Sequence, residues 1–202
     1  MFFQYGLRYI PSDGETNVYR TVKIEDLPHN TMLNEVLKAV PGTIYSAGMF
    51  DTTTINGSKT VIVVFVEQKH AFYLIDLAEK GLKTGSALAR VTLVNTPTYP
   101  FSAEVEKWVE KGQIRTLVLS NVHNSTKKDV IALLNGSELV SCVESIKDGP
   151  QNDQLTVNFY TIQSAIKACH TLRAARNGRG QQFYVLGHLK EMDSEQFCGP
   201  GR

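Results

Sequence analysis

Cationic side chains gather in one stretch near the carboxyl end of this 202-residue chain. From Gln154 through Lys190 there is no acidic residue, whereas Lys167, Arg173, Arg176, Arg179 and Lys190 all occur there. The three arginines belong to a helix end that runs into a glycine-broken loop. Such a loop can contact phosphate groups, and each contact makes binding sensitive to salt. Basic residues also complement the dipole at a helix C-terminus, so a purely structural role stays open.

Signatures of catalysis and of metal binding are missing from the sequence. It contains no glycine-rich phosphate loop, no His-Glu-x-x-His motif and no Gly-x-Ser-x-Gly nucleophile elbow. The cysteines are odd in number and widely spaced, at Cys142, Cys169 and Cys198, which argues against a disulfide framework and a paired-cysteine zinc site. We therefore expect no enzymatic activity, no cofactor and no metal.

Charge and hydropathy set the class of protein. The 21 Lys and Arg residues nearly balance the 20 Asp and Glu residues, so the chain lacks the surplus of a sequence-blind nucleic-acid binder. It has no basic N-terminal region followed by a long apolar segment, and no run of about 18 apolar residues. We expect an intracellular protein without a membrane span, in the nucleus or the cytoplasm.

The elements that must position these residues occur twice. The segments 19–27 and 114–122 both read as a short strand that begins with Arg-Thr and ends in a turn. About forty residues after each, an apolar strand ends in Phe, and an Ala in a helical pattern follows six positions later: Phe65 with Ala71, and Phe159 with Ala165. These constant offsets indicate two copies of one unit.

Each copy is predicted to run strand, helix, strand, strand, helix, strand. In the first copy we expect strands at 20–26, 43–50, 59–66 and 89–94, with helices from Asn30 or Thr31 to about residue 40 and at 68–82. Asn56-Gly57 predicts a hairpin between the middle strands. In the second copy we expect strands at 115–121, 139–145, 154–160 and 183–189, with helices at 126–134 and 162–174.

This order predicts an α+β fold of two ferredoxin-like domains, each a four-stranded antiparallel sheet with two helices on one face. We place an N-terminal extension at 1–18, the first domain at 19–97, a linker at 98–113, the second domain at 114–192 and a tail at 193–202. A short helix at 102–111 lies in the linker, and we expect its Trp108 to pack against a domain.

Both copies resemble RNA-recognition motifs. Residues 117–122 are similar to the shorter signature of that family, and residues 22–27 match it more weakly. Of the longer signature, the Phe-to-Ala half is present in both copies. The tandem layout and the tail at 197–200 resemble fungal two-motif proteins. The resemblance implies RNA binding, in post-transcriptional regulation or processing.

The signatures are degenerate, because the base-stacking positions of the family hold no aromatic residue. Side chains alternate along a strand, so a buried Phe65 places Thr60 and Ile62 outward. The corresponding positions are Lys23 on the first strand, and Val118, Gln154 and Thr156 in the second copy. Each missing stack removes on the order of 1 to 3 kcal/mol of binding free energy.

Three hypotheses follow. The first is that polar and basic contacts bind single-stranded RNA, with these candidate residues: Lys23, Lys59, Thr60, Ile62, Val118, Gln154, Thr156, Arg173, Arg176 and Arg179. Lys23 and Lys59 would place positive charge on the first sheet, although Glu25 can pair with Lys23. The second is a protein-interaction module that uses its sheet or helical faces. The third, a ligand-sensing or catalytic domain, lacks a convergent acid, base or nucleophile.

Overall fold

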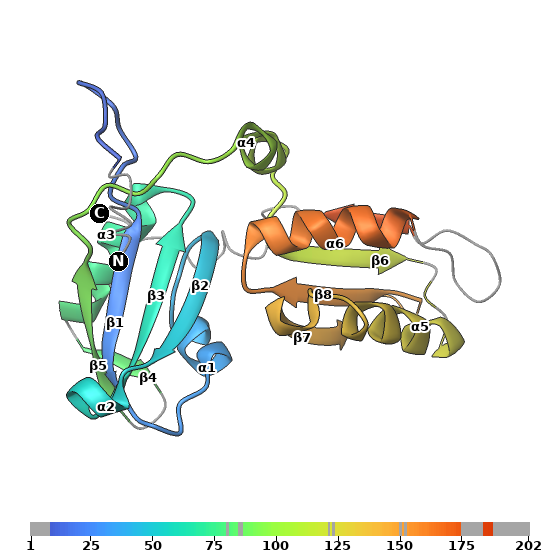
Figure 1. Cartoon of the computed structure of the whole chain (residues 1–202), viewed down its shortest axis with the longest axis horizontal. Coiled ribbons are helices and arrows are strands. Elements are labelled where there is room, and N and C mark those ends of the chain that lie inside the picture. Colours follow the sequence, from blue (N-terminus) through green and yellow to red (C-terminus); the bar gives the residue numbers. More distant parts are fainter. Residues whose placement is uncertain are drawn as a thin grey trace, which may run out of the picture. The chain divides into compact units, whose positions relative to one another are not determined.

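The chain forms two compact units, one of residues 1–40 with 49–101 and the other of residues 41–48 with 102–202. The structure is a computed structural model that describes residues 9–79, 81–84, 87–120, 122, 124–149, 151, 153–174 and 184–187. Each unit is built around its own β-sheet (Figure 1).

The first sheet and its helices follow the predicted order and add one strand. Residues 44–48 of one strand of this sheet are grouped with the second compact unit, and the other described elements of the sheet belong to the first. The elements are β1 (Thr21–Leu27), α1 (Leu33–Lys38), β2 (Ile44–Asp51), α2 (Thr53–Asn56), β3 (Lys59–Phe65), α3 (Gln68–Glu79), β4 (Leu82–Thr84) and β5 (Ala87–Leu93). The sheet order is β2-β3-β1-β5-β4, and β1 pairs antiparallel with β3 and β5. Among the described residues this sheet therefore has five strands, one more than predicted.

The extra strand explains where the α3 helix ends. We predicted a helix to Leu82, but α3 ends at Glu79 and Gly81 adopts φ 89°, a left-handed conformation that favours glycine. Leu82 then pairs with Ala89 across β4 and β5. The predicted hairpin neighbours β2 and β3 are confirmed, although the one-turn helix α2 occupies their connection and ends at Gly57, with φ 75°.

Alternating strand residues form the core of the first unit. Val22 and Ile24 of β1, together with Val61, Val63 and Phe65 of β3, have no exposed surface. Buried residues of both helices join them, namely Val36 and Leu37 of α1 and Ala71 and Leu74 of α3. The period of two in the strands thus produces the predicted apolar inner face.

The second unit is the predicted four-stranded domain. Its elements are α4 (Ala103–Glu110), β6 (Thr116–Ser120), α5 (Asn124–Asn135), the 3₁₀ helix η1 (Val140–Cys142), β7 (Val143–Asp148), β8 (Leu155–Phe159), α6 (Ile162–Ala174) and β9 (Tyr184–Gly187). The sheet order is β7-β8-β6-β9. The strand predicted from residue 139 begins only at Val143, because η1 takes up the preceding residues.

One core joins both helices to one face of the second sheet. Leu117 and Leu119 of β6 and Leu155, Val157 and Phe159 of β8 pack with α5 and α6, which lie on the same side of the sheet (Figure 1). The side chains between them, such as Val118 and Thr156, therefore point to the opposite face. The helices of this unit do not cover that face.

The internal repeat extends to matching hydrogen bonds around one arginine in each unit. Arg20 Nη1 donates to the carbonyl oxygen of Phe65 at 3.2 Å, and Arg115 Nη1 donates to that of Phe159 at 3.0 Å. In each pair the phenylalanine N–H donates to the arginine carbonyl at 2.9 Å. The Arg-Thr and Phe landmarks of the two copies thus occupy equivalent places.

The helix predicted between the domains packs on the second unit. Ser102 Oγ caps α4 by accepting from Val105 N at 3.4 Å. Trp108 packs against the core of the second unit, and its Nε1 donates to the carbonyl oxygen of Ile114 at 3.1 Å. The structural role predicted for this tryptophan is confirmed. Among the described residues, no helix is long and apolar enough to cross a membrane.

Candidate nucleic-acid interface

The outer face of the first sheet carries an ion-paired cluster. Lys23 Nζ lies 2.9 Å from Glu25 Oε1, as the sequence suggested. Arg90 of β5 reaches the same carboxylate at 3.5 Å and Asp26 Oδ2 at 3.2 Å. Two cations therefore face two carboxylates, so this cluster carries no net positive charge for a phosphate.

The other candidates of the first sheet are spread along β3. Ile62 lies opposite Lys23 and is half-buried. Lys59 Nζ donates to the carbonyl oxygen of Thr31 at 3.2 Å. Thr60 is only 6% exposed and its hydroxyl lies 3.0 Å from Thr52 Oγ1, so the expectation that it lies open at the surface is wrong. The connection from β2 covers it, which alternation within one strand does not reveal.

The candidates of the second sheet lie closer together. Val118 of β6 pairs with Thr156 of β8, and both are half-buried on the face away from the helices. Gln154 precedes β8, where its carbonyl oxygen accepts from Gly149 N at 2.9 Å and its Nε2 donates to Gln151 at 3.2 Å. Val118 and Thr156 are thus sheet-face residues, whereas Gln154 belongs to the turn.

A row of polar side chains that we did not predict crosses this face. Thr116 Oγ1 donates to Asn158 Oδ1 at 2.7 Å, and Asn158 Nδ2 donates to Ser145 Oγ at 3.0 Å. These three residues, one each from β6, β8 and β7, are directly opposite one another in the sheet. We call them the polar row.

Lys147 belongs to the next row along the strands. It lies opposite Thr156, is exposed, and forms no ion pair with any residue that the structure describes. Successive residues on one face of a strand are about 6.6 Å apart. The second sheet face therefore combines an accessible ammonium group with a neighbouring row of hydrogen-bonding groups. From the sequence, alternation along the strand that ends at the buried Phe159 places Asn158 on the outer face. Its neighbours Thr116 and Ser145 could not be predicted in this way, because they depend on how the strands pair.

The basic stretch is only partly described. Arg173 lies at the end of α6, where its Nη2 donates to the carbonyl oxygen of Val185 at 3.0 Å. This hydrogen bond ties α6 to β9 and gives the arginine a structural role. Arg176 and Arg179 lie outside the described residues, so their predicted phosphate contacts stay predictions.

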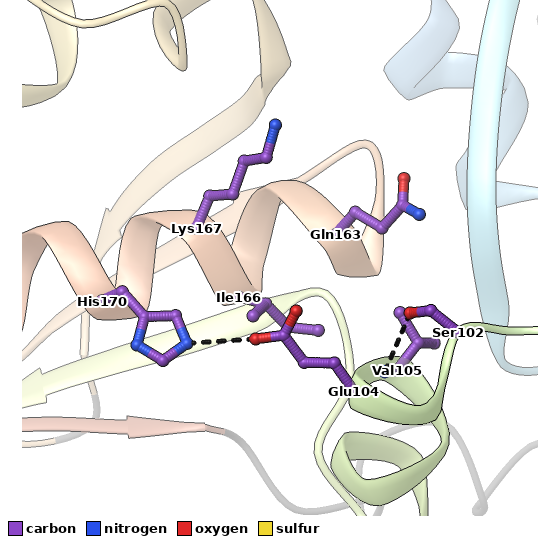
Figure 2. A pocket seen from close by; sticks show the side chains of 7 residues that line it. All are labelled: Ser102, Glu104, Val105, Gln163, Ile166, Lys167 and His170. Atoms are coloured by element: carbon purple, nitrogen blue, oxygen red, sulfur yellow. Dashed lines mark hydrogen bonds and ion pairs between the residues drawn. The ribbon is translucent and has the colours of Figure 1, made fainter.

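A pocket of about 240 Å³ lies between α4 and α6 within the second unit (Figure 2). His170 Nε2 lies 3.3 Å from Glu104 Oε1, and both side chains are about two-thirds exposed. Ser102 also lines the pocket, but its hydroxyl serves as the cap of α4. Ser102 thus caps α4, and His170 and Glu104 form an exposed contact between α6 and α4. Nowhere among the described residues do three potential metal ligands gather.

The strand orders identify the fold. Both sheets place the first strand of the copy between its third and last strands, with the second strand beyond the third. Each unit has the ferredoxin-like fold that the resemblance to RNA-recognition motifs predicted. This tandem arrangement confirms the predicted fold class, with the fifth strand of the first sheet as the difference.

Comparison with known proteins gives likenesses of low identity. No protein-family model and no curated protein matches the chain. The N-terminal three RNA-binding domains of the yeast splicing factor Prp24 are 17% identical, over 83% of this chain and 62% of that one, with a TM-score of 0.35. The first two such domains of the yeast poly(U)-binding protein Pub1 are 11% identical, over 85% of this chain and 100% of that one, with a TM-score of 0.34.

A further likeness is to RNA-recognition domains 1 and 2 of Drosophila melanogaster Sex-lethal, with 15% identity, 84% coverage of this chain, 99% of that one and a TM-score of 0.28. The chain spans 62% of the three-domain Prp24 structure. None of these likenesses assigns a role to a residue of this chain, and the fungal character suggested by the tail stays a prediction.

Proposed function

We propose that this chain is an intracellular protein that binds single-stranded RNA, through polar and basic contacts, in post-transcriptional regulation or processing. The observation that carries the proposal is the outer face of the second sheet. It presents Lys147 beside hydrogen-bonding side chains, and the helices of the unit cover the other face.

The residues of this face set the expected strength of binding. Val118, Thr156 and Gln154 provide no aromatic ring, so stacking contributions on the order of 1 to 3 kcal/mol per base are absent. Lys147 adds one phosphate contact, and we expect further contacts from Arg176 and Arg179, which lie outside the described residues. We therefore expect micromolar affinity that falls steeply as salt rises.

Fluorescence anisotropy tests this proposal with the full chain and a labelled pool of random single-stranded RNA at 50 and 200 mM salt, where binding should be salt-sensitive. Lys147→Ala should weaken binding and reduce the salt slope by about one. Lys38→Ala, an exposed lysine of α1 in the first unit, is the matched control and should bind like the wild type. Absence of RNA binding at the lower salt would reject the proposal.

The charge reversal of Arg173, Arg176 and Arg179 tests the basic edge separately. Because Arg173 also holds β9, the reversed protein must first be checked for an unchanged thermal unfolding transition. If the folded variant binds RNA with unchanged affinity and salt slope, the basic edge is not a phosphate site.

A second candidate function is protein interaction, and one observation favours it. Phe72, Tyr73 and Leu77 on α3 are 42%, 37% and 37% exposed, and Tyr73 and Leu77, four residues apart, lie on the same face of the helix. Phe72→Asp should abolish capture of a protein partner if α3 is the docking surface, whereas Ile62→Asp or Val118→Asp should do so if a sheet face is. A partner retained by all three folded variants contradicts these docking surfaces, and failure of the wild-type chain to capture any protein contradicts this function.

A further inference from the structure

We propose that the second sheet binds the ribose-phosphate backbone of RNA rather than its bases, with the polar row as the site that contacts the ribose 2′-hydroxyl. This inference rests on the proposed function and specifies its substrate. It predicts that the chain prefers RNA over DNA and shows little preference among bases.

The chemistry of the polar row is the first reason. Thr116, Asn158 and Ser145 are uncharged, half-buried and held by two hydrogen bonds, so their orientation is fixed before a ligand arrives. A side-chain amide has two N–H donors and two acceptor lone pairs, and the row uses one of each on Asn158. One donor and one acceptor remain for a ligand.

Ser145 leaves a further group available. Its hydroxyl oxygen accepts from Asn158, and no described residue accepts the hydroxyl hydrogen. Ser145 can therefore donate to an incoming oxygen while Asn158 donates beside it. A ribose 2′-hydroxyl both donates and accepts, which matches these groups, and DNA lacks it.

The neighbouring row supplies the phosphate contact. Lys147 is exposed and lies two residues from Ser145 on the same strand, about 6.6 Å along the same face. Sugar and phosphate alternate along a nucleic-acid strand, so one chain laid over β7 and β8 meets an ammonium group and then the hydrogen-bonding row. Neither row contains an aromatic side chain that would favour a base plane.

The first sheet supports the assignment by contrast. Its cations Lys23 and Arg90 already pair with Glu25 and Asp26, and a charged carboxylate repels a phosphate. On the first sheet, the described cations Lys23 and Arg90 are thus paired with carboxylates. On the second sheet, Lys147 forms no ion pair with a described residue and lies beside the polar row.

The test compares labelled 12-nucleotide strands of one mixed sequence as RNA, DNA and 2′-O-methyl RNA, titrated with the full chain in an anisotropy assay. Wild type should bind RNA about five- to tenfold more tightly than DNA, the factor expected from one or two hydrogen bonds. The 2′-O-methyl strand, which cannot donate, should bind more weakly than RNA. Homopolymers of U and A should differ by less than about threefold.

Variants of the row connect the preference to these residues. Asn158→Ala should bring the RNA to DNA affinity ratio close to one, mainly by weakening RNA binding. Ser145→Ala changes a residue of the edge strand and leaves the hydrogen bond between Thr116 and Asn158 intact. It should lower the RNA to DNA affinity ratio by about half, and it replaces Asn158→Ala as the test if that variant unfolds. Asn135→Ala, an exposed asparagine at the end of α5, is the matched control.

The outcomes separate the two proposals. Equal binding of RNA and DNA by wild type, or a folded row variant that keeps the wild-type ratio, overturns the ribose contact while RNA binding stands. A strong preference for one base also overturns it. If the wild-type chain binds no strand at 50 mM salt, the proposed function fails, and this inference fails with it.

Discussion

The ion-paired cluster on the first sheet gives a quantitative prediction through the variant Glu25→Gln. The side chain of Glu25 is only 12% exposed and contacts Lys23 at 2.9 Å and Arg90 at 3.5 Å. Glutamine has nearly the same shape and keeps the ability to accept hydrogen bonds, so the variant removes charge without leaving a cavity. The loss should therefore report the two ion pairs and little else.

The expected magnitude follows from the exposure of the partners. Lys23 is 40% exposed and Arg90 is 61% exposed, so solvent screens both pairs. Pairs of this kind contribute about 0.2–1 kcal/mol each, and Arg90 keeps its contact with Asp26. We expect the free energy of unfolding to fall by about 0.5–2 kcal/mol.

The assay is thermal and urea unfolding, followed by circular dichroism, at 50 mM and 500 mM NaCl. At a scale of roughly 4–8 °C per kcal/mol for a domain of this size, the loss is visible at low salt. It should shrink at high salt because the Debye length falls. Glu67→Gln is the matched control, since Glu67 pairs with Lys69 at a more exposed site and should lose less.

The reasoning is refuted if Glu25→Gln is no less stable than Glu67→Gln, or if its loss is the same at both salt concentrations. The variant also bears on function, because it frees positive charge on the first sheet. If RNA lies on the second sheet as proposed, its affinity for RNA should be unchanged.

Two further predictions concern Cys169 and Gly149 of the second unit. Burial raises the pKa of the Cys169 thiol, which keeps the thiol protonated at neutral pH. Iodoacetamide should therefore alkylate the partly exposed Cys142 first and Cys169 only in denaturant. Equal alkylation rates of the two cysteines in the folded protein, measured by peptide mapping, would contradict this. Gly149→Ala should lower the free energy of unfolding by about 1–3 kcal/mol, because the new Cβ would lie 2.5 Å from the Cβ of Gln154. Gly57→Ala is the comparison, because Gly57 has φ 75° but a new Cβ there would have no atom within 4 Å. This variant should lose about 1 kcal/mol of unfolding free energy in the same urea titration. An equal loss at Gly57 and Gly149 would show that the contact with Gln154 relaxes without cost.

Local patterns in the sequence determined the elements and the repeat. Alternating apolar residues that end at Phe65 and Phe159 predicted β3 and β8 with their inner faces, and helical spacing predicted α6 at its observed bounds. The offsets between these landmarks were enough to predict two copies of one fold. These patterns can be recognised in the sequence because each one depends only on residues that are close together along the chain.

Only the tertiary structure decided the surfaces. The polar row joins Thr116 to Asn158, 42 residues away, and Asn158 to Ser145, 13 residues away, so its existence depends on strand register. Likewise, Thr60 is buried, and its hydroxyl lies 3.0 Å from that of Thr52 in the β2–β3 connection, although its position in the strand predicted exposure. A sequence specifies which face a side chain takes along one strand, but pairing between distant strands decides what lies beside it and what covers it.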